Sequence, residues 1–155
     1  AGGRLFAFGN GGSATDAQQV ATLYLNPGGG STPLAAFSLA SDPATLTALC
    51  NDIGVDVVFS RQIAAFGRQQ DIAVGLSTSG NSANMLRAFD EASRRGMLTI
   101  GFSGYEGGKM AEADTIDYLF VAPSSSVHRI QEAQTTVYNI LWELTLAALS
   151  QQAGG

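Results

Sequence analysis

The sequence predicts an α/β fold: a three-layer α/β/α sandwich around a five-stranded parallel sheet, with helices wound onto both faces. Two patterns lead to this prediction. Short runs are apolar throughout instead of alternating with polar residues, which is typical of strands buried on both faces. Helical patterns separate these runs, as crossovers between parallel strands require. The runs expected as strands cover residues 4–9, 34–40, 71–77, 97–103 and 115–122.

Six segments beside these runs carry helix signals. Ser13 is expected as the N-cap of the first helix, with Asp16 three residues further on. Ser41 or Asp42 is expected to cap the second helix, because Pro43 follows in the first turn, where its missing N–H is not needed. The predicted helices cover residues 13–25, 41–50, 56–67, 81–96, 107–113 and 127–150.

Length and composition restrict the classes of protein that fit. The chain has 155 residues, and we expect a single domain over residues 1–155. Hydrophobic residues make up 45% and charged residues 14%, a balance opposite to that of disordered chains. The net charge is −5, and the eight Lys and Arg residues are scattered. The sequence therefore offers no basic patch for nucleic acid or for an anionic membrane.

Cysteine usage and hydropathy favour the cytoplasm. Cys50 is the single cysteine, so no internal disulfide can form. We expect Cys50 to be a small buried hydrophobe rather than a nucleophile. No apolar run approaches the ~18–20 residues of a membrane span, and no signal peptide is visible. The expected localisation is cytoplasmic.

The loop "GNGGSATD" at residues 9–16 joins the first predicted strand to the first helix. Glycines let backbone N–H groups approach a ligand closely, and the helix start behind them favours an anion. The pattern is neither a Walker loop nor a complete GxGxxG motif. It predicts an anion-binding loop, and a plain tight turn is the alternative.

The loop "STSGNS" at residues 77–82 has the same place after the third predicted strand. It carries four hydroxyl side chains and an Asn around one Gly. A helix cap would need only one hydroxyl, whereas several hydroxyls together with free N–H groups can surround a phosphate without using positive charge. We therefore expect a phosphate or sugar-phosphate site here.

Several motifs follow one another in a fixed order along the chain: "GNGGS", "SD" (41–42), "ND" with Gly54 (51–54), "FSRQ" (59–62), "STSGNS", "GGKMA" (107–111) and "RIQE" (129–132). Together they resemble the sugar isomerase (SIS) domain family, and within it the phosphoheptose isomerase group, over residues 2–150. The resemblance implies the fold already predicted. Members usually carry a helical segment before the first strand, which residues 1–155 do not include.

The resemblance implies ligand-binding roles for eight residues. Four match the family's phosphate-binding loop: Ser77, Thr78, Ser79 and Ser82. Asn10 and Ser13 match positions that line the sugar site. Asp52 matches an acidic residue near the substrate, and Gln131 matches a glutamine of the site at the start of the last helix. The implied partner is a phosphorylated sugar.

The resemblance also implies catalytic and zinc positions, and here this sequence departs from the family. Where members carry a His and a Glu on the first helix and a His on the last, this chain has Gln19, Leu23 and Asn139. None of these is a base at neutral pH, and Leu23 has no atom that binds a metal, so we expect no metal cofactor.

Two titratable groups on the last predicted helix remain as catalytic candidates. His128 stands near its start, where members usually carry an acid, and Glu132 follows Gln131. The alternative for His128 is a polar rim or capping residue. The alternative for Glu132 is an acid that suits the positive end of the helix dipole.

Two functions stay open at this point. The first is a sugar-phosphate-binding protein of the phosphoheptose isomerase type, whose reaction interconverts the aldose and ketose forms of sedoheptulose 7-phosphate. The second is a non-catalytic sensor or oligomeric adaptor that resembles the replication-initiator-associating branch of the family. A homo-oligomer, dimer or tetramer, is expected because members assemble and because the last helix carries a long apolar side. That side comprises Ile130, Ala133, Val137, Ile140, Leu141, Leu144 and Leu149.

Overall fold

The structure is a computed structural model that describes residues 2–153. Five strands form one sheet in the order β2-β1-β3-β4-β5, and all neighbouring pairs are parallel. The predicted fold class is thus confirmed. The strands are β1 (Leu5–Gly9), β2 (Ala36–Ser38), β3 (Ile72–Leu76), β4 (Leu98–Gly104) and β5 (Tyr118–Ala122).

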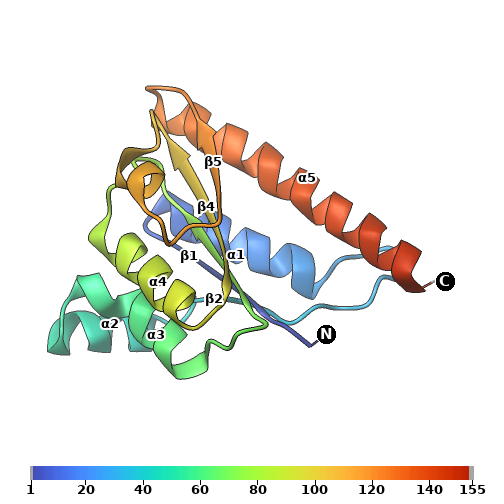
Figure 1. Cartoon of the computed structure of the whole chain (residues 1–155), viewed down its shortest axis with the longest axis horizontal. Coiled ribbons are helices and arrows are strands. Elements are labelled where there is room, and N and C mark those ends of the chain that lie inside the picture. Colours follow the sequence, from blue (N-terminus) through green and yellow to red (C-terminus); the bar gives the residue numbers. More distant parts are fainter. Residues whose placement is uncertain (1, 154–155) are drawn as a thin grey trace.

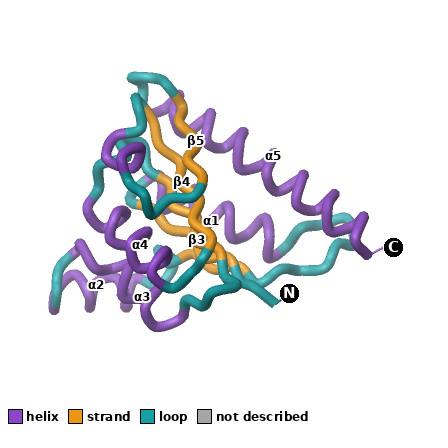
Figure 2. Tube along the Cα trace, viewed as in Figure 1, coloured by secondary structure: helices purple, strands orange, loops and turns teal. Residues whose placement is uncertain are grey.

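Helices cover both faces of the sheet. Figure 1 shows α1 and α5 on one side of the strands and α2, α3 and α4 on the other, and Figure 2 shows the strands as a layer between them. Two short 3₁₀ turns, η1 and η2, complete the chain. The helical elements are α1 (Gly12–Leu25), α2 (Pro43–Asp52), η1 (Val55–Val57), α3 (Val58–Phe66), α4 (Ala83–Arg94), η2 (Gly108–Glu112) and α5 (Val127–Ala153).

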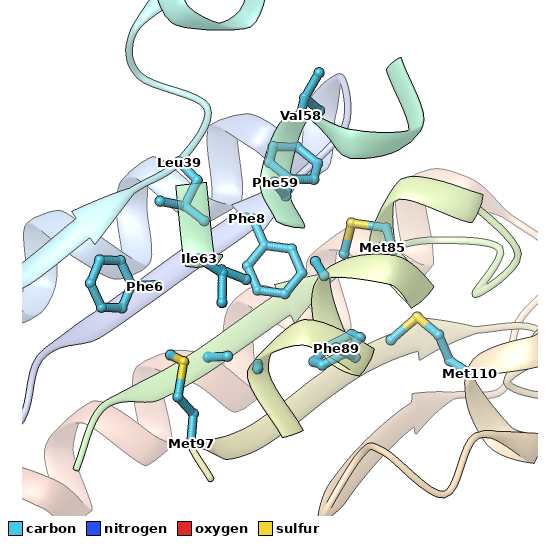
Figure 3. Packing of buried hydrophobic residues seen from close by; sticks show 13 residues of the cluster. Phe6, Phe8, Leu39, Val58, Phe59, Ile63, Met85, Phe89, Met97 and Met110 are labelled. Carbon is cyan, nitrogen blue, oxygen red and sulfur yellow. The ribbon is translucent and has the colours of Figure 1, made fainter. Parts of the chain in front are cut away.

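Alternate residues of β1 supply two separate cores. Leu5 and Ala7 join the cluster under α1 and α5, whereas Phe6 and Phe8 join the cluster under α3 and α4. Figure 3 shows Phe8 close to Phe59 and Phe89, whose ring centroids lie 5.6 and 5.2 Å from its own. Alternate side chains of β1 point to opposite faces, and both faces are covered by helices. The strand is therefore apolar throughout, as the sequence pattern predicted.

The first helix begins differently from the prediction. Ser13 is not the N-cap: α1 starts at Gly12, Gly11 occupies the cap position with φ 57°, and Ser13 lies buried in the first turn. A positive φ at Gly11 lets the chain turn sharply out of β1. No side chain makes a capping hydrogen bond at this helix start.

The second helix confirms one prediction and corrects another. Asp42 caps α2, since its Oδ1 accepts from the N–H groups of Ala44 and Thr45 at 3.0 and 3.1 Å. Cys50, expected to be buried, is exposed. The reason is that α2 lies at the border of the fold and none of its residues is fully buried.

The last helix confirms part of its predicted apolar side. Ile130 is buried, and Val137 and Leu141 are partly buried against the core. The most deeply buried row is Ile130, Gln134 and Tyr138, which are spaced four residues apart and are 0, 2 and 4% exposed. Because this side packs against α1 and the sheet, four predicted positions face outward: Ala133, Ile140, Leu144 and Leu149. Within residues 2–153, no helix is both long and apolar enough to cross a membrane.

Candidate functional site

The two glycine- and serine-rich loops meet where the winding of the sheet changes direction. β1 and β3 are neighbours, but β1 leads into α1 on one face of the sheet and β3 leads into α4 on the other. The loops therefore part from each other beyond the strand ends. In parallel α/β sheets, ligands bind in the crevice that forms at such a switch point.

A cavity of about 70 Å³ lies at this crevice. Apart from Leu76, its lining is polar, and it consists of Asn10, Ser13, Ser77, Thr78, Ser79 and Ser82. Six of the eight residues singled out from the sequence thus surround one small space. They come from both loops, although about 65 residues separate these loops in the chain.

The hydroxyl groups of Ser77 and Ser79 are oriented by hydrogen bonds that they accept, which leaves their own hydrogens available to donate. The N–H of Gly80 donates to Ser77 Oγ at 2.9 Å, and the N–H of Asn81 donates to Ser79 Oγ at 3.2 Å. Each of these oxygens already accepts a hydrogen bond, whereas its own O–H hydrogen has no partner among the described residues. Both hydroxyls can therefore act as donors to an anion in the cavity.

The loop at residues 77–82 packs against the turn at the start of η2. Gly80 has φ 68°, and a Cβ on it would collide with the carbonyl oxygen of Gly107. The N–H of Met110 donates to Gly80 O at 3.0 Å, and the N–H of Lys109 donates to Asn81 Oδ1 at 2.9 Å. Close packing of two turns leaves no room for a side chain at residue 80.

An amide pair joins the two loops. Asn10 Nδ2 donates to Asn84 Oδ1, and Asn84 Nδ2 donates to Asn10 Oδ1, both at 2.9 Å. Asn84 is buried at the start of α4. The motif analysis did not single out Asn84. Its signal is the second Asn of "STSGNSAN", in the first turn of the helix that follows the loop.

Two glutamines of α5 approach the loops from the other side. Gln131, a predicted site residue, lies so close to Gly12 that a Cβ there would collide with its side-chain nitrogen. Gln134, which the sequence analysis missed, donates its Nε2 to the carbonyl oxygen of Ser77 at 2.7 Å. Its Oε1 is buried and has no partner among the described residues.

Besides Gln131, three predicted residues do not line this cavity. Asp52 is exposed at the end of α2, where it accepts a hydrogen bond from Asn51. His128 is exposed in the first turn of α5. Glu132 is exposed as well, and it pairs with Arg129 at 2.7 Å. Within the described residues, neither His128 nor Glu132 lines the cavity with the serine and threonine hydroxyls.

A further acid lies between α1 and α5, one turn beyond Ser13. Tyr138 donates its hydroxyl to Asp16 Oδ1 at 3.2 Å, and Asp16 Oδ2 is buried without a partner among the described residues. Burial raises the pKa of Asp16, and the hydrogen bond from Tyr138 opposes this rise without cancelling it. Burial also raises the pKa of Tyr138.

The positions at which the family resemblance implies zinc ligands do not fit that metal. Gln19 is exposed on α1, and Leu23 offers no ligand atom. Asn139 donates its Nδ2 to Thr135 O at 2.8 Å. Zinc sites in proteins use Cys, His and carboxylate ligands. In residues 2–153, no group of three or more such side chains is placed to hold a metal ion.

A larger and more open cleft, of about 780 Å³, lies next to the small cavity. Ser79 lines both, so the two spaces adjoin. Tyr105 and Glu106 stand on the far side of the cleft, and Tyr105 has a left-handed backbone with φ 52°. A ligand anchored in the small cavity would have space to extend from it.

Comparisons with known proteins agree with the fold. A family model described as SIS domain matches residues 1–104. The chain is 46% identical over 145 residues to a phosphoheptose isomerase of Desulfovibrio desulfuricans, which covers 93% of this chain and 68% of the relative.

Two solved structures are similar over nearly the whole chain. The phosphoheptose isomerase of Neisseria gonorrhoeae matches with a TM-score of 0.84 and 42% identity, over 92% of this chain and 75% of that one. The phosphoheptose isomerase of Francisella tularensis matches with a TM-score of 0.88 and 32% identity, over 94% and 78%. The chain therefore belongs to the SIS domain family.

Proposed function

We propose that the protein binds a phosphorylated sugar of the sedoheptulose 7-phosphate class, with the phosphate in the cavity between the two loops. The observation that carries the proposal is the lining of that cavity by hydroxyl and amide side chains from both loops. The relatives support it as well, since they are named as enzymes that act on phosphorylated heptoses.

The donors at the cavity suit a phosphate group. Ser77 and Ser79 can each donate a hydroxyl hydrogen, as their oxygens already accept. Within the described chain, the first N–H of α4 with a backbone partner is that of Met85, which donates to Ser82 O at 3.1 Å. The N–H groups of Ala83 and Asn84 have no partner among the described residues, and the positive end of the helix dipole adds to their attraction for an anion.

The sugar portion would extend toward α1 and α5, where Asn10, Ser13 and Gln131 offer hydrogen-bonding groups. Asn10 is committed to Asn84, and this fixes the orientation of its amide. A sugar hydroxyl both donates and accepts, so it can use the remaining lone pair of such an amide oxygen. This direction is the one that the family resemblance implies.

We also propose that the protein binds its ligand without zinc-dependent isomerisation. Interconversion of an aldose and a ketose moves a proton between C1 and C2 and needs a base within hydrogen-bond reach. Gln19, Leu23 and Asn139 supply neither a base nor a metal site. A role as a sensor or an adaptor follows from this proposal. The alternative is an isomerase that uses a base at another position. The experiment below distinguishes this alternative from a non-catalytic role.

Assembly into a homo-oligomer remains part of the proposal. Ile140 and Leu144 are 48 and 62% exposed on the outer side of α5. A second copy that covers this side would remove apolar surface from water. Light scattering at micromolar concentration is expected to give a dimer or tetramer, and a monomer would contradict this expectation.

The deciding experiment is proton NMR of sedoheptulose 7-phosphate with the protein in deuterated water. We expect the sugar signals to broaden with the wild-type protein and with Ser93→Ala, an exposed serine at the end of α4. We expect no broadening with Ser79→Ala, and no deuterium in the sugar in any sample. Absence of broadening with the wild type would refute binding. Deuterium at C1 or C2 that Ser79→Ala abolishes would refute the non-catalytic role and establish an isomerase.

A further inference from the structure

We propose that Gln134 is a positioning residue for the phosphate-binding loop: its side-chain amide fixes the carbonyl group of Ser77 and thereby the direction of the Ser77 hydroxyl. The inference rests on the proposed function, because it takes the hydroxyls of this loop as the phosphate donors. It assigns a ligand-binding role to a residue of α5 that does not itself line the cavity.

Ser77 is held by three hydrogen bonds from three directions. Its N–H donates to Phe102 O of β4 at 2.9 Å. Its Oγ accepts from the N–H of Gly80 at 2.9 Å. Its carbonyl oxygen accepts from Gln134 Nε2 at 2.7 Å. The first bond continues the sheet and the second closes the loop, so the third is the one that sets the peptide plane between Ser77 and Thr78.

The peptide plane matters because it directs the first two hydroxyl residues of the loop. If the carbonyl of Ser77 loses its partner, the peptide that links Ser77 to Thr78 can rotate. Rotation would move both side chains relative to Ser79 and Ser82. A phosphate bound by several donors loses affinity when the donors no longer point to one centre.

Packing alone does not explain a glutamine at this position. Gln134 is 2% exposed, in a row with Ile130 and Tyr138, and its Oε1 has no partner among the described residues. A buried polar atom without a partner destabilises the folded state. A methionine has a similar length and no such atom. What the amide provides that a methionine could not is the hydrogen bond to the carbonyl of Ser77.

Gln62 provides a matched control. It too is a buried glutamine whose Nε2 donates to backbone carbonyls, those of Leu39 at 2.9 Å and Val58 at 2.8 Å. It lies on the opposite face of the sheet, in α3, and lines no part of the cavity. Gln62 is therefore a buried glutamine that donates to backbone carbonyls as Gln134 does, but it has no link to the loop.

The test compares Gln134→Met, Gln134→Glu and Gln62→Met with the wild type, in affinity for sedoheptulose 7-phosphate by calorimetry and in melting temperature. Gln134→Met is expected to weaken binding about tenfold, the effect of about one lost hydrogen bond. Its melting temperature is expected to stay within about 4 °C of the wild type. The variant removes the unpartnered Oε1 of Gln134 but leaves the carbonyl oxygen of Ser77 without a donor, and these two effects oppose each other. Gln134→Glu is expected to weaken binding at least as much, because a carboxylate cannot donate to the carbonyl.

Gln62→Met is expected to lower the melting temperature and to leave the affinity unchanged. Wild-type affinity in Gln134→Met would overturn the inference and leave the proposed function intact. So would a loss of affinity in Gln62→Met equal to that in Gln134→Met, since it would show a general effect of stability. Absence of binding by the wild-type protein would overturn the proposed function, and this inference with it.

Discussion

Asn10 and Asn84 face each other at the ends of two neighbouring strands and exchange two hydrogen bonds, each 2.9 Å long. Asn10 follows β1, and Asn84 stands in the first turn of the helix that follows β3. The strands lead to opposite faces of the sheet, so the two loops diverge beyond this point. The amide pair joins the loops directly, and it also determines the orientation of the Asn10 amide at the cavity.

Replacing Asn84 by Asp is expected to weaken sugar-phosphate binding at least about tenfold. The carboxylate accepts from Asn10 Nδ2 but has no hydrogen to return, and its charge repels a phosphate at the loop. Asn51→Asp is the control, since it adds the same charge at an exposed position of α2. Titration calorimetry of both variants measures the difference. Equal affinities in the two variants would show that the pair does not organise the site.

Alanine at Gly80 is expected to lower the free energy of unfolding by about 3 kcal/mol and to abolish measurable binding. The added Cβ would collide with Gly107 O and require a left-handed backbone. Gly29 separates these two effects, because its φ is 59° and nothing lies within 4 Å of the position of a Cβ. Gly29→Ala should therefore cost only about 1 kcal/mol for the backbone and leave binding intact. Urea denaturation and calorimetry give both quantities, and a loss in Gly29→Ala as large as that in Gly80→Ala would contradict the collision.

Asp71 should make the protein sensitive to acid. Burial alone would raise the pKa of this carboxyl, but hydrogen bonds from the Arg4 side chain and from the N–H groups of Arg4 and Arg68 outweigh burial and hold it below its usual value. A depressed pKa contributes stability above the pKa of the unfolded state, and the contribution is lost as the pH falls through the folded value. Asp71→Asn is expected to lose about 2 kcal/mol at pH 7.

The difference between Asp71→Asn and the wild type should shrink below about pH 4, where the unfolded carboxyl takes up a proton. Denaturant titrations at pH 7, 4 and 3 measure it. Asp52→Asn, at an exposed carboxyl on α2, serves as the control and should match the wild type at each pH. A constant difference between Asp71→Asn and the wild type at every pH would show that the ionised carboxylate is not what stabilises the start of β3.

Asp16 should affect the pH dependence of stability in the opposite direction to Asp71. Burial raises its pKa, so the folded state disfavours the ionised form, and this penalty appears as the pH rises from the unfolded value through the folded one. Asp16→Asn removes the charge and keeps an oxygen for the hydroxyl of Tyr138. The variant is expected to be at least as stable as the wild type at pH 7 and to lose this advantage near pH 3. Thermal unfolding at both pH values tests it, and a less stable variant at pH 7 would contradict the assignment.

The sequence analysis succeeded where one pattern decides the outcome. Continuous apolar runs such as residues 71–77 can only be accommodated between two helix layers, so the sheet and its parallel order could be predicted. The loop at 77–82 stood out because its hydroxyls are adjacent in the chain, and the loop at 9–16 stood out because glycines precede a helix start. Both loops line one cavity, and their ligand-binding role stays a prediction.

Contacts between segments far apart in the chain could not be predicted from such local patterns. Gln134 and Asn84 are polar residues within helical patterns, and only the packing of α5 and α4 brings them to Ser77 and Asn10. The apolar side of α5 was predicted only in part, because its sequence is apolar on more than one face. The row with Ile130, Gln134 and Tyr138 is buried because α1 packs there, which the helix period alone cannot specify.

The departure of the two loops to opposite faces has a consequence for the whole molecule. A ligand bound by both loops would further join the helix layer of α1 and α5 to that of α3 and α4, where the Asn10–Asn84 pair and the hydrogen bond from Gln134 to Ser77 already connect them. Opening of either layer would then require release of the ligand first. Amide hydrogen exchange should consequently slow in both layers together on binding, with one common dependence on ligand concentration.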